Sequence, residues 1–280
     1  MLDKPAGISS ARAVAQVKRL LPKKTKIGHT GTLDPLASGL LVLLIGRSTR
    51  LSRYVTDLDK TYTATARFGA VSDTLDAEGE ITELDAPTPT SEDLGRAAQD
   101  FTGDLLQTPP MASAVKVGGS RLYDLHRRGV TIERESRPVK IHALTPTSHE
   151  EPFATFEVSC SSGTYVRTLI SDLAESLGTG AYLTALIRTS VGNLDLENAI
   201  PPEEASQSTI HNRIIPADVV VDHLPLVEAG AEERGGIRHG RSIARRGING
   251  SFRVWGEGEL LAIYRDEDEV ARPEVVLCPA

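Results

Sequence analysis

The stretch GHTGTLDPLASGLL, residues 28–41, is the most unusual part of the sequence, and the neighbouring elements are placed by it. It packs three glycines, two threonines and one carboxylate, Asp34, between a basic segment and an apolar run at 40–45. Pro35 disfavours a helical conformation at the residue before it, so we expect the Asp34 carboxylate to project from the end of a sheet. An ordinary turn aspartate is the alternative, which these residues alone leave open.

The segments on both sides of this stretch have periodic patterns. After Ser9, apolar residues at positions i, i+3 and i+7 predict an amphipathic helix that Ser9 caps and that stops near Pro22. Downstream, the branched run at 40–45 is typical of a short strand buried on both faces, and a helical turn or two is expected over 48–55.

The rest of the first two hundred residues alternates between strand and helix patterns. Period-two and apolar runs predict strands, and 3.6-residue periods predict helices, the last of them capped by Thr164. The predicted strands are 60–69, 111–117, 153–160 and 182–191, and the predicted helices are 91–101, 120–128 and 164–177. The acidic segment 73–81 lacks the third-position ligand and the terminal glutamate of an EF-hand, so we expect a solvated loop there.

The C-terminal quarter has a different texture. Short β candidates at 251–256, 259–265 and 274–278 are separated by glycine or charged turns, which is typical of a small barrel-like domain. Prolines and polar residues after position 200 indicate a connection. We therefore expect two domains, residues 1–205 and 216–280.

Composition excludes several classes of protein. The 280 residues are 40% hydrophobic and 25% charged, as in soluble globular chains. The longest apolar run is far shorter than the roughly 20 residues of a membrane-spanning helix, and we see no signal peptide. Two cysteines, Cys160 and Cys278, are too few for a disulfide framework or a four-ligand zinc site. We expect a cytoplasmic protein without a metal.

The formal net charge of −7 conceals basic tracts. Residues 1–53 carry an excess of eight positive charges, 54–114 an excess of nine negative charges, and 115–145 an excess of four positive charges. Residues 234–253 contain six arginines and no acid. Separated basic tracts are typical of a long footprint on a nucleic-acid backbone, although solvated helix faces would give the same pattern.

Three further side chains are candidates for chemistry. Arg167 falls in the first turn of a predicted helix, where a cation opposes the helix dipole, so we expect an anionic partner such as Asp34 or a phosphate. An arginine without a partner is the alternative. Tyr62 is either a core tyrosine or a platform for a base, and His29 is a loop histidine unless a ligand shows otherwise. P-loop, GxSxG and GxGxxG motifs are absent from the sequence, which leaves carboxylate chemistry without a cofactor.

Four motifs together resemble the TruB family of pseudouridine synthases over residues 1–192. They are DKPAGISS (3–10), GHTGTLDPLASGLL (28–41), DKTY (59–62) and SSGTYVRTLISDLAESLG (161–178), in this order. The C-terminal part resembles the small PUA-like β domain of bacterial members. The resemblance implies an α+β fold, with a mixed, mostly antiparallel sheet flanked by helices, followed by that β-barrel-like module.

The same resemblance implies a reaction and roles. The reaction turns the uridine at position 55 in the T arm of tRNA into pseudouridine and needs no cofactor or metal. Asp34 would be the nucleophile, Arg167 its ion-pair partner, Tyr62 the ring stacked on the target base, and His29 a residue that inserts into the RNA stack.

We also expect tRNA contacts from the basic tracts, the last of them on the acceptor side. The expected RNA-binding residues are Lys4, Lys18, Arg19, His29, Arg50, Tyr165, Arg241 and Arg245. The chain is expected to act as a monomer, with no membrane and no obligate protein partner. Two alternatives are an RNA-folding chaperone in which catalysis is secondary, and a guide-RNA-dependent enzyme of a larger particle.

Overall fold

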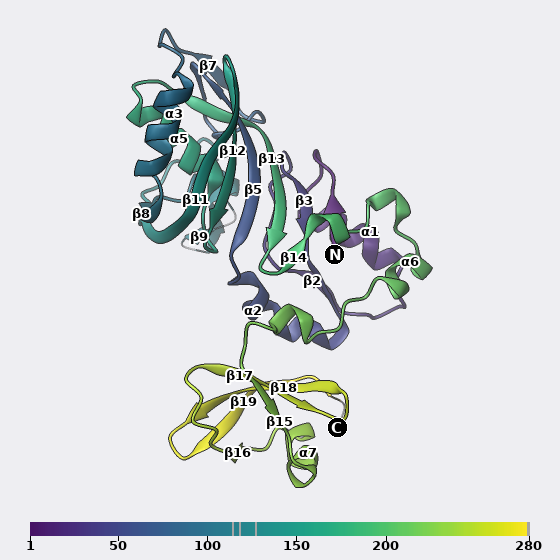
Figure 1. Cartoon of the computed structure of the whole chain (residues 1–280). Coiled ribbons are helices and arrows are strands. Elements are labelled where there is room, and N and C mark those ends of the chain that lie inside the picture. The colour runs from purple at the N-terminus through teal and green to yellow at the C-terminus, as the bar shows by residue number, and fades with distance from the viewer. Residues whose placement is uncertain (114, 118, 127, 279–280) are drawn as a thin grey trace.

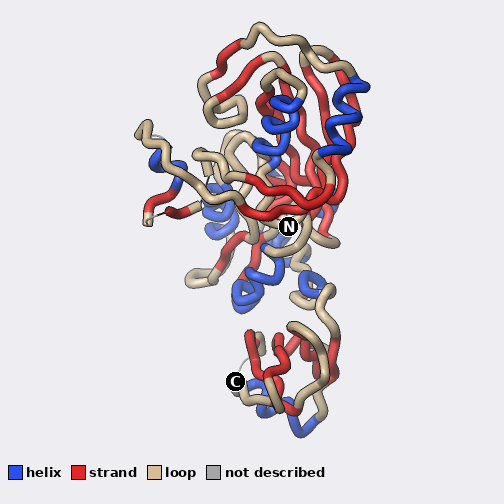
Figure 2. The backbone as a smooth tube through the Cα atoms, turned by 90° about the vertical axis from the view of Figure 1, so that its left-hand side faces the viewer, coloured by secondary structure: helices blue, strands red, loops and turns tan. Residues whose placement is uncertain are grey.

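A curved sheet and a smaller C-terminal sheet make up the protein (Figure 1). The structure is a computed structural model that describes residues 1–113, 115–117, 119–126 and 128–278. In both views the C-terminal sheet lies at one end of the molecule, below the larger sheet (Figures 1 and 2). The division into domains 1–205 and 216–280 stays a prediction.

The larger sheet has eight strands, and its central path runs β1-β3-β13-β5-β12-β11-β8, with β14 paired to β13. Its neighbours are antiparallel except for the parallel pair β13 and β3. The strands are β1 (Leu2–Lys4), β3 (Ser38–Leu41), β5 (Lys60–Phe68), β8 (Gly103–Gln107), β11 (Arg137–Glu150), β12 (Phe153–Cys160), β13 (Ala181–Val191) and β14 (Leu194–Asp195). The predicted mixed, mostly antiparallel sheet is confirmed.

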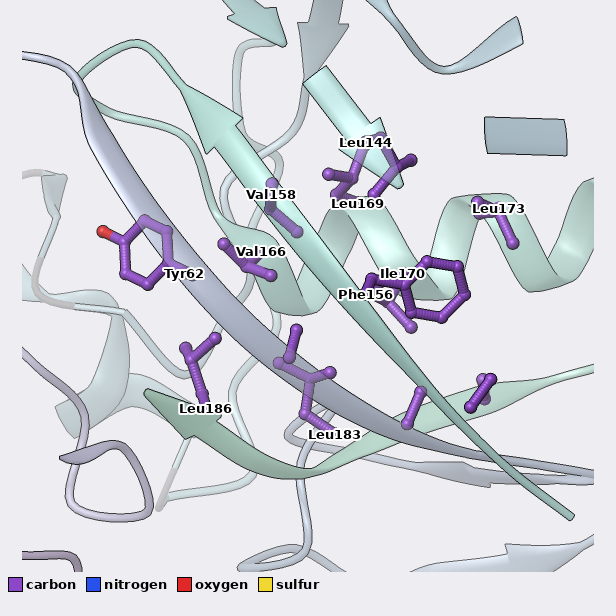
Figure 3. Close-up of a cluster of buried hydrophobic side chains, with 14 of the residues drawn as sticks. Tyr62, Leu144, Phe156, Val158, Val166, Leu169, Ile170, Leu173, Leu183 and Leu186 are labelled. Atoms are coloured by element: carbon purple, nitrogen blue, oxygen red, sulfur yellow. The ribbon is translucent and has the colours of Figure 1, made fainter. Parts of the chain in front are cut away.

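Two helices, α3 (Ser91–Asp100) and α5 (Val166–Ser176), lie together on one side of this sheet (Figure 1). Because β5 alternates strictly, its even-numbered side chains all face the buried side. They meet the apolar stripe of α5, where Leu169, Ile170 and Leu173 are fully buried against Phe156 (Figure 3). The predicted helices at 91–101 and 164–177 and the strands at 60–69, 153–160 and 182–191 are confirmed.

The region around residues 28–41 follows the prediction in part. Ser9 caps α1 (Ser10–Arg19) by accepting a hydrogen bond from the backbone of Arg12, and short helices follow at η1 (Gly46–Leu51) and α2 (Ser52–Thr56). The single strand expected at 40–45 is wrong, because the strand is interrupted at Val42, whose carbonyl accepts from Thr30 N. The run divides between β3 and β4 (Leu43–Ile45), and β4 pairs with β2 (Ile27–His29).

Three other local predictions are wrong. Thr164 does not cap α5; its hydroxyl donates to the Ser161 carbonyl, and Tyr165 is the N-cap residue. The strand at 111–117 reduces to β9 (Lys116–Val117), paired with β10 (Ser120–Arg121), and α4 covers only Leu122–His126. Ala114, Gly118 and Arg127 lie outside the described residues.

The C-terminal sheet has the order β15-β17-β18-β19-β16. All three predicted β segments are present, although the last begins at Val270. The elements are β15 (Leu226–Glu228), α7 (Ala231–Arg238), β16 (Ile243–Ala244), β17 (Ser251–Gly256), β18 (Glu259–Glu267) and β19 (Val270–Val276). Elsewhere are β6 (Ala70–Ser72), β7 (Ile81–Glu83), α6 (Gln207–Asn212), η2 (Leu196–Asn198), η3 (Pro202–Glu204) and η4 (Val219–Val221).

The C-terminal sheet packs against η1 and α2. Leu51 and Val55 belong to one buried apolar cluster with Ile263 of β18. Arg50, which we expected to bind RNA, is exposed and donates to the Val276 carbonyl at 2.7 Å. Its observed contact is therefore with the C-terminal sheet, and its RNA contact stays a prediction. None of the helices in the described part of the chain has the length and apolarity needed to cross a membrane.

Candidate active site

The loop that carries Asp34 is held from several sides. Ser10, the first residue of α1, donates to the Leu33 carbonyl at 3.0 Å and accepts from Leu33 N at 2.8 Å. Gly7 N donates to the Pro35 carbonyl at 2.7 Å. The loop joins β2 to β3, and 36% of the Asp34 side chain is exposed.

Lys4 holds this loop through hydrogen bonds to backbone carbonyls. Its side chain is completely buried, and Nζ donates to the carbonyls of Pro5 at 2.8 Å, Ile8 at 2.7 Å and Pro35 at 3.5 Å. Burial lowers the pKa of Lys4 to about 8, although the Asp34 charge opposes that shift. An ammonium group enclosed by carbonyls cannot reach a phosphate at the surface. Our prediction of Lys4 as an RNA contact is therefore wrong, and Lys4 belongs to the support of the Asp34 loop.

Arg167 joins two carboxylates inside the protein. Its guanidinium lies 2.9 Å from Asp34 Oδ2 through Nη2 and 3.0 Å from Asp76 Oδ2 through Nη1. It also donates to the carbonyls of Thr74 and Ala112, each at 2.7 Å. Only 4% of the Arg167 side chain is exposed. The anionic partner expected for this arginine is thus present, and Asp34 is that partner.

Asp76 is the residue that sequence reasoning missed. It lies in the acidic segment expected to be solvated, yet it is 2% exposed, so that expectation is wrong at this position. Its Oδ1 accepts from Thr74 Oγ1 at 2.7 Å and from Glu78 N at 3.1 Å. Ala77 N ties the loop to the Leu183 carbonyl of β13. A run of acids is normally solvated, and the buried charge of Arg167 explains this exception.

Tyr62 lies at one end of the buried cluster, and its hydroxyl points away from the aliphatic side chains (Figure 3). Burial raises the pKa of this hydroxyl, and the charge of Arg188, a fully buried residue of β13, opposes that shift. Arg188 in turn donates to the carbonyls of Leu40 at 2.8 Å and Gly31 at 3.2 Å. Sequence reasoning missed Arg188 also, although a cation within an apolar strand is a signal that such a partner exists.

Gly39 allows β3 to approach Arg188. Its φ is +96°, and a Cβ at this position would lie 2.4 Å from the Arg188 carbonyl oxygen. Both facts require glycine, because an added side chain would collide with backbone. Gly39 of the 28–41 stretch is therefore needed for the close contact between β3 and β13.

These side chains surround one cleft of about 360 Å³. That volume lies in the range of pockets that hold small ligands, roughly 300–1,000 Å³. Polar groups on its wall come from Asp34, Lys60, Tyr62, Tyr165, Arg167 and Arg188, and apolar ones from Leu33, Val166 and Leu186. The structure thus brings together the three predicted catalytic residues and Tyr165.

Gln107 orients Tyr165 at the start of α5. Its side-chain amide donates to the Tyr165 carbonyl at 3.2 Å and accepts from Tyr165 N at 2.9 Å. This pairing holds the backbone of the N-cap residue, and α5 has no side-chain hydrogen bond of the kind that we had expected from a threonine cap. It also fixes the backbone of Tyr165, two positions before Arg167, whose side chain lines the cleft.

The other expected RNA-binding residues lie outside the cleft. His29 is half-buried in β2, and burial, with the Arg188 charge, lowers its pKa below the usual value, so the ring is neutral at pH 7. Lys18 and Arg19 are exposed in the last turn of α1. Arg241 and Arg245 are exposed on either side of β16 in the C-terminal sheet. Their contacts with RNA stay predictions.

Opposing effects act on the pKa of Asp34 in the cleft. Burial raises the pKa of Asp34 above its ordinary value, the Arg167 charge lowers it, and the nearby Asp76 raises it. A carboxylate that is oriented by a guanidinium and open to the cleft on one side can act as a nucleophile. In the described part of the chain, no cluster of three or more His, Cys, Asp or Glu side chains is placed to hold a metal ion.

Comparison with known proteins agrees with this geometry. The family model described as TruB family pseudouridylate synthase (N terminal domain) matches residues 18–166. The chain belongs to the TruB family. Among its relatives, the tRNA pseudouridine synthase B of Cupriavidus metallidurans is 44% identical, and the match covers 98% of this chain and 92% of that protein. The tRNA pseudouridine synthase B of Haemophilus influenzae is 37% identical, with 99% and 91% covered.

Solved structures confirm that this TruB-family chain has the pseudouridine synthase fold. A chain from the crystal structure of a Cbf5-Nop10-Gar1 complex superposes with a TM-score of 0.75 at 25% identity, covering 99% of this chain and 84% of that one. The archaeal box H/ACA sRNP Nop10-Cbf5 complex gives 0.72 at 22% identity, with 99% and 85% covered. These matches extend over both sheets.

Proposed function

We propose that this chain converts uridine to pseudouridine in tRNA, at position 55 of the T arm, with Asp34 as the nucleophile. The observation that carries the proposal is the Asp34–Arg167 ion pair, 2.9 Å long, in the wall of a cleft that Tyr62 also lines. The relatives named tRNA pseudouridine synthase B support the choice of tRNA. The enzyme is proposed to act as a monomer in the cytoplasm.

A uridine stacked in an RNA loop cannot enter the cleft, so it must be extruded at a cost of a few kcal/mol. Tyr62 stacks on the extruded base, and His29 replaces the base in the RNA stack. Arg167 is almost completely buried, and burial strengthens the contact that it makes with Asp34. Backbone phosphates bind the exposed basic residues of α1 and of the C-terminal sheet.

The reaction is an isomerisation, and Asp34 carries it through a transient covalent bond to the nucleoside. The glycosidic bond between N1 and C1′ breaks, the base turns, and a bond from C5 to C1′ forms. C5 loses its proton and N1 gains one, so that the atoms balance without a redox step. Arg167 keeps Asp34 ionised and oriented during attack, as its two-carboxylate geometry favours.

The test uses the purified chain and a synthetic T-arm stem-loop. Pseudouridine has the mass of uridine, so the product is detected by carbodiimide labelling followed by primer extension. We expect a stop at position 55 that depends on the enzyme. A stem-loop with cytidine at that position is the control and should give no stop. Labelling elsewhere, or none at all, would reject the proposed site of modification.

The two rival functions predict other results in the same assay. An RNA chaperone of this fold would bind the stem-loop and leave position 55 unmodified. A guide-dependent enzyme would also fail on the bare stem-loop; the Cbf5 chains were solved in complexes with Nop10, and in one case also with Gar1. The higher identity with the tRNA pseudouridine synthase B protein, and the larger share of that protein that is matched (92% against 84%), favour the guide-free enzyme.

The pH dependence of activity reports on Asp34. Because burial raises the pKa of Asp34 and attack needs the ionised form, kcat/KM should fall with acid at a pH above the ordinary aspartate value of about 3.9. In Asp76→Asn a like charge is removed and Arg167 faces Asp34 alone. The acid limb of the profile should therefore move to lower pH.

Asp73→Asn is the matched control, since Asp73 lies in the same loop with about half of its side chain exposed. This variant should leave the acid limb where it is in the unmodified protein. An acid limb that stays in place or moves to higher pH in Asp76→Asn would contradict the assignment of that limb to Asp34.

The corrected role of Lys4 makes a second prediction. Lys4→Met removes the donor from carbonyls that Lys4 serves, so the free energy of unfolding should fall by about 1–3 kcal/mol. The slope of log binding constant against log salt should not change. Lys18→Gln, on the exposed face of α1, should lower that slope by about 1 and leave stability nearly unchanged. Denaturant titration and salt-dependent tRNA binding measure both, and the reverse pattern would restore Lys4 as a phosphate contact.

A further inference from the structure

Glu274 of β19 lies where the C-terminal sheet meets α2. From α2, the Tyr54 hydroxyl donates to Oε2 at 2.8 Å and Arg53 Nη2 lies 2.8 Å from Oε1. From its own sheet, Ser251 Oγ donates to Oε2 at 2.5 Å and Arg265 Nε donates to Oε1 at 3.0 Å. Both carboxylate oxygens therefore have a partner on each side of the junction.

This arrangement differs from an ordinary surface ion pair. The Glu274 side chain is 16% exposed. Burial alone would raise its pKa, but hydrogen bonds from Ser251, Tyr54 and Arg265, with the Arg53 charge, lower the pKa to about 2. Glu274 is thus ionised at every pH at which the enzyme is expected to work. Charge-assisted bonds that share one carboxylate are stronger and more directional than isolated exposed pairs, which contribute little.

The short helix α2 connects this junction to the cleft. Arg53 and Tyr54 contact Glu274, and Thr56, the last residue of the same helix, lines the cleft. Lys60 Nζ donates to the Thr56 carbonyl and lines the cleft beside it. The Lys60 contact holds the cleft end of this five-residue helix without Glu274, so loss of the Glu274 contacts would change the position of the C-terminal sheet and leave the cleft wall in place.

A second set of contacts joins the C-terminal sheet to the segment just before α2. Arg47 donates to the Leu277 carbonyl at 3.1 Å, and Leu277 packs in the apolar cluster with Leu51. The chain itself enters the C-terminal sheet through the connection between η4 and β15. The position of the exposed arginines of that sheet, Arg241 and Arg245, relative to the cleft therefore depends on how firmly this junction is held.

We propose that Glu274 is a positioning residue for tRNA modification: it fixes the C-terminal sheet in one orientation relative to the cleft. An RNA that contacts both parts then binds in one register. If the C-terminal sheet were attached but free to reorient, its RNA-binding residues would have a lower effective concentration near an RNA that is already bound at the cleft. The proposal rests on the proposed function, and it adds that full-length tRNA, unlike an isolated T arm, is recognised across this junction.

The experiment compares two substrates and two charge-neutralising variants. Glu274→Gln keeps the size of the side chain and should lower kcat/KM on full-length tRNA about tenfold, mainly through KM, corresponding to about 1.4 kcal/mol. On the T-arm stem-loop its kcat/KM should stay within about twofold of the unmodified protein. Glu267→Gln is the matched control, because Glu267 is a half-exposed acid of the same sheet that pairs with Arg272. It should change neither substrate.

Tyr54→Phe provides an independent measurement if Glu274→Gln folds poorly. It removes one donor to Glu274 and leaves the ring in place, so it should change the ratio of the two kcat/KM values in the same direction by about threefold. Equal loss on both substrates, no loss on either, or an equal effect of Glu267→Gln would overturn the proposal. If the unmodified protein fails on the stem-loop and on tRNA alike, the proposed function itself is wrong.

Discussion

Replacing Asp34 by asparagine should abolish pseudouridine formation while tRNA still binds. Loss of the attacking group in an enzyme that uses a covalent intermediate lowers kcat by about 10⁴-fold or more. The new amide has nearly the size of the carboxylate, and the loop around it is held by Ser10 and Gly7 through backbone groups that the substitution does not touch. We therefore expect the cleft to keep its shape and the dissociation constant of tRNA to change by less than about threefold.

Single-turnover carbodiimide assays and filter binding measure the two quantities separately. Asp59→Asn is the matched control, since Asp59 carries the same side chain close to the cleft residue Lys60 but pairs with His142 and is exposed. It should retain activity within a few-fold. Substantial activity in Asp34→Asn would remove the nucleophile from the mechanism. An RNA chaperone, by contrast, would show no isomerisation to lose.

The local elements could be predicted where burial is periodic. In β5 every second residue faces the core, and in α5 one stripe does, so the pattern of apolar residues was sufficient. Two of the failures are alike, because each involves a partner outside the predicted segment. Thr30 N donates to the carbonyl of Val42, where the predicted strand is interrupted, and Gln107, rather than Thr164, bonds the backbone at the start of α5. The residues of the predicted segment do not indicate either partner.

The residues of the candidate site could also be predicted only in part. A cation in the first turn of a helix is unfavourable unless an anion is near, so the sequence alone predicted an anionic partner for Arg167, either a carboxylate such as Asp34 or a phosphate. The helix dipole does not tell how many anions surround the cation, so Asp76 was missed. Lys4 was misplaced because a basic residue in a basic tract is normally exposed. Burial of a charge follows from the arrangement of distant segments, which composition does not record.

Arg167→Met should have the largest effect on stability. The substitution fills similar space but leaves the carboxylates of Asp34 and Asp76 without their cation, and the carbonyls of Thr74 and Ala112 without a donor. Removing one partner of a buried ion pair typically costs about 3–5 kcal/mol. Activity should fall together with stability, because Asp34 loses both its orientation and the charge that keeps it ionised.

The pH dependence of this loss separates electrostatics from packing. In the unmodified protein Arg167 opposes the burial that raises the pKa of Asp34, so without it that pKa should rise further. A group with a folded pKa above its unfolded value loses stability as pH rises between the two, so Arg167→Met should be less destabilised at pH 5 than at pH 7. Urea denaturation at both pH values measures this. Arg67→Met, which breaks an exposed bidentate pair with Glu83, should cost about 1 kcal/mol or less. A loss in Arg167→Met that is equal at both pH values would mean that packing alone, rather than the paired charges, holds the cleft together.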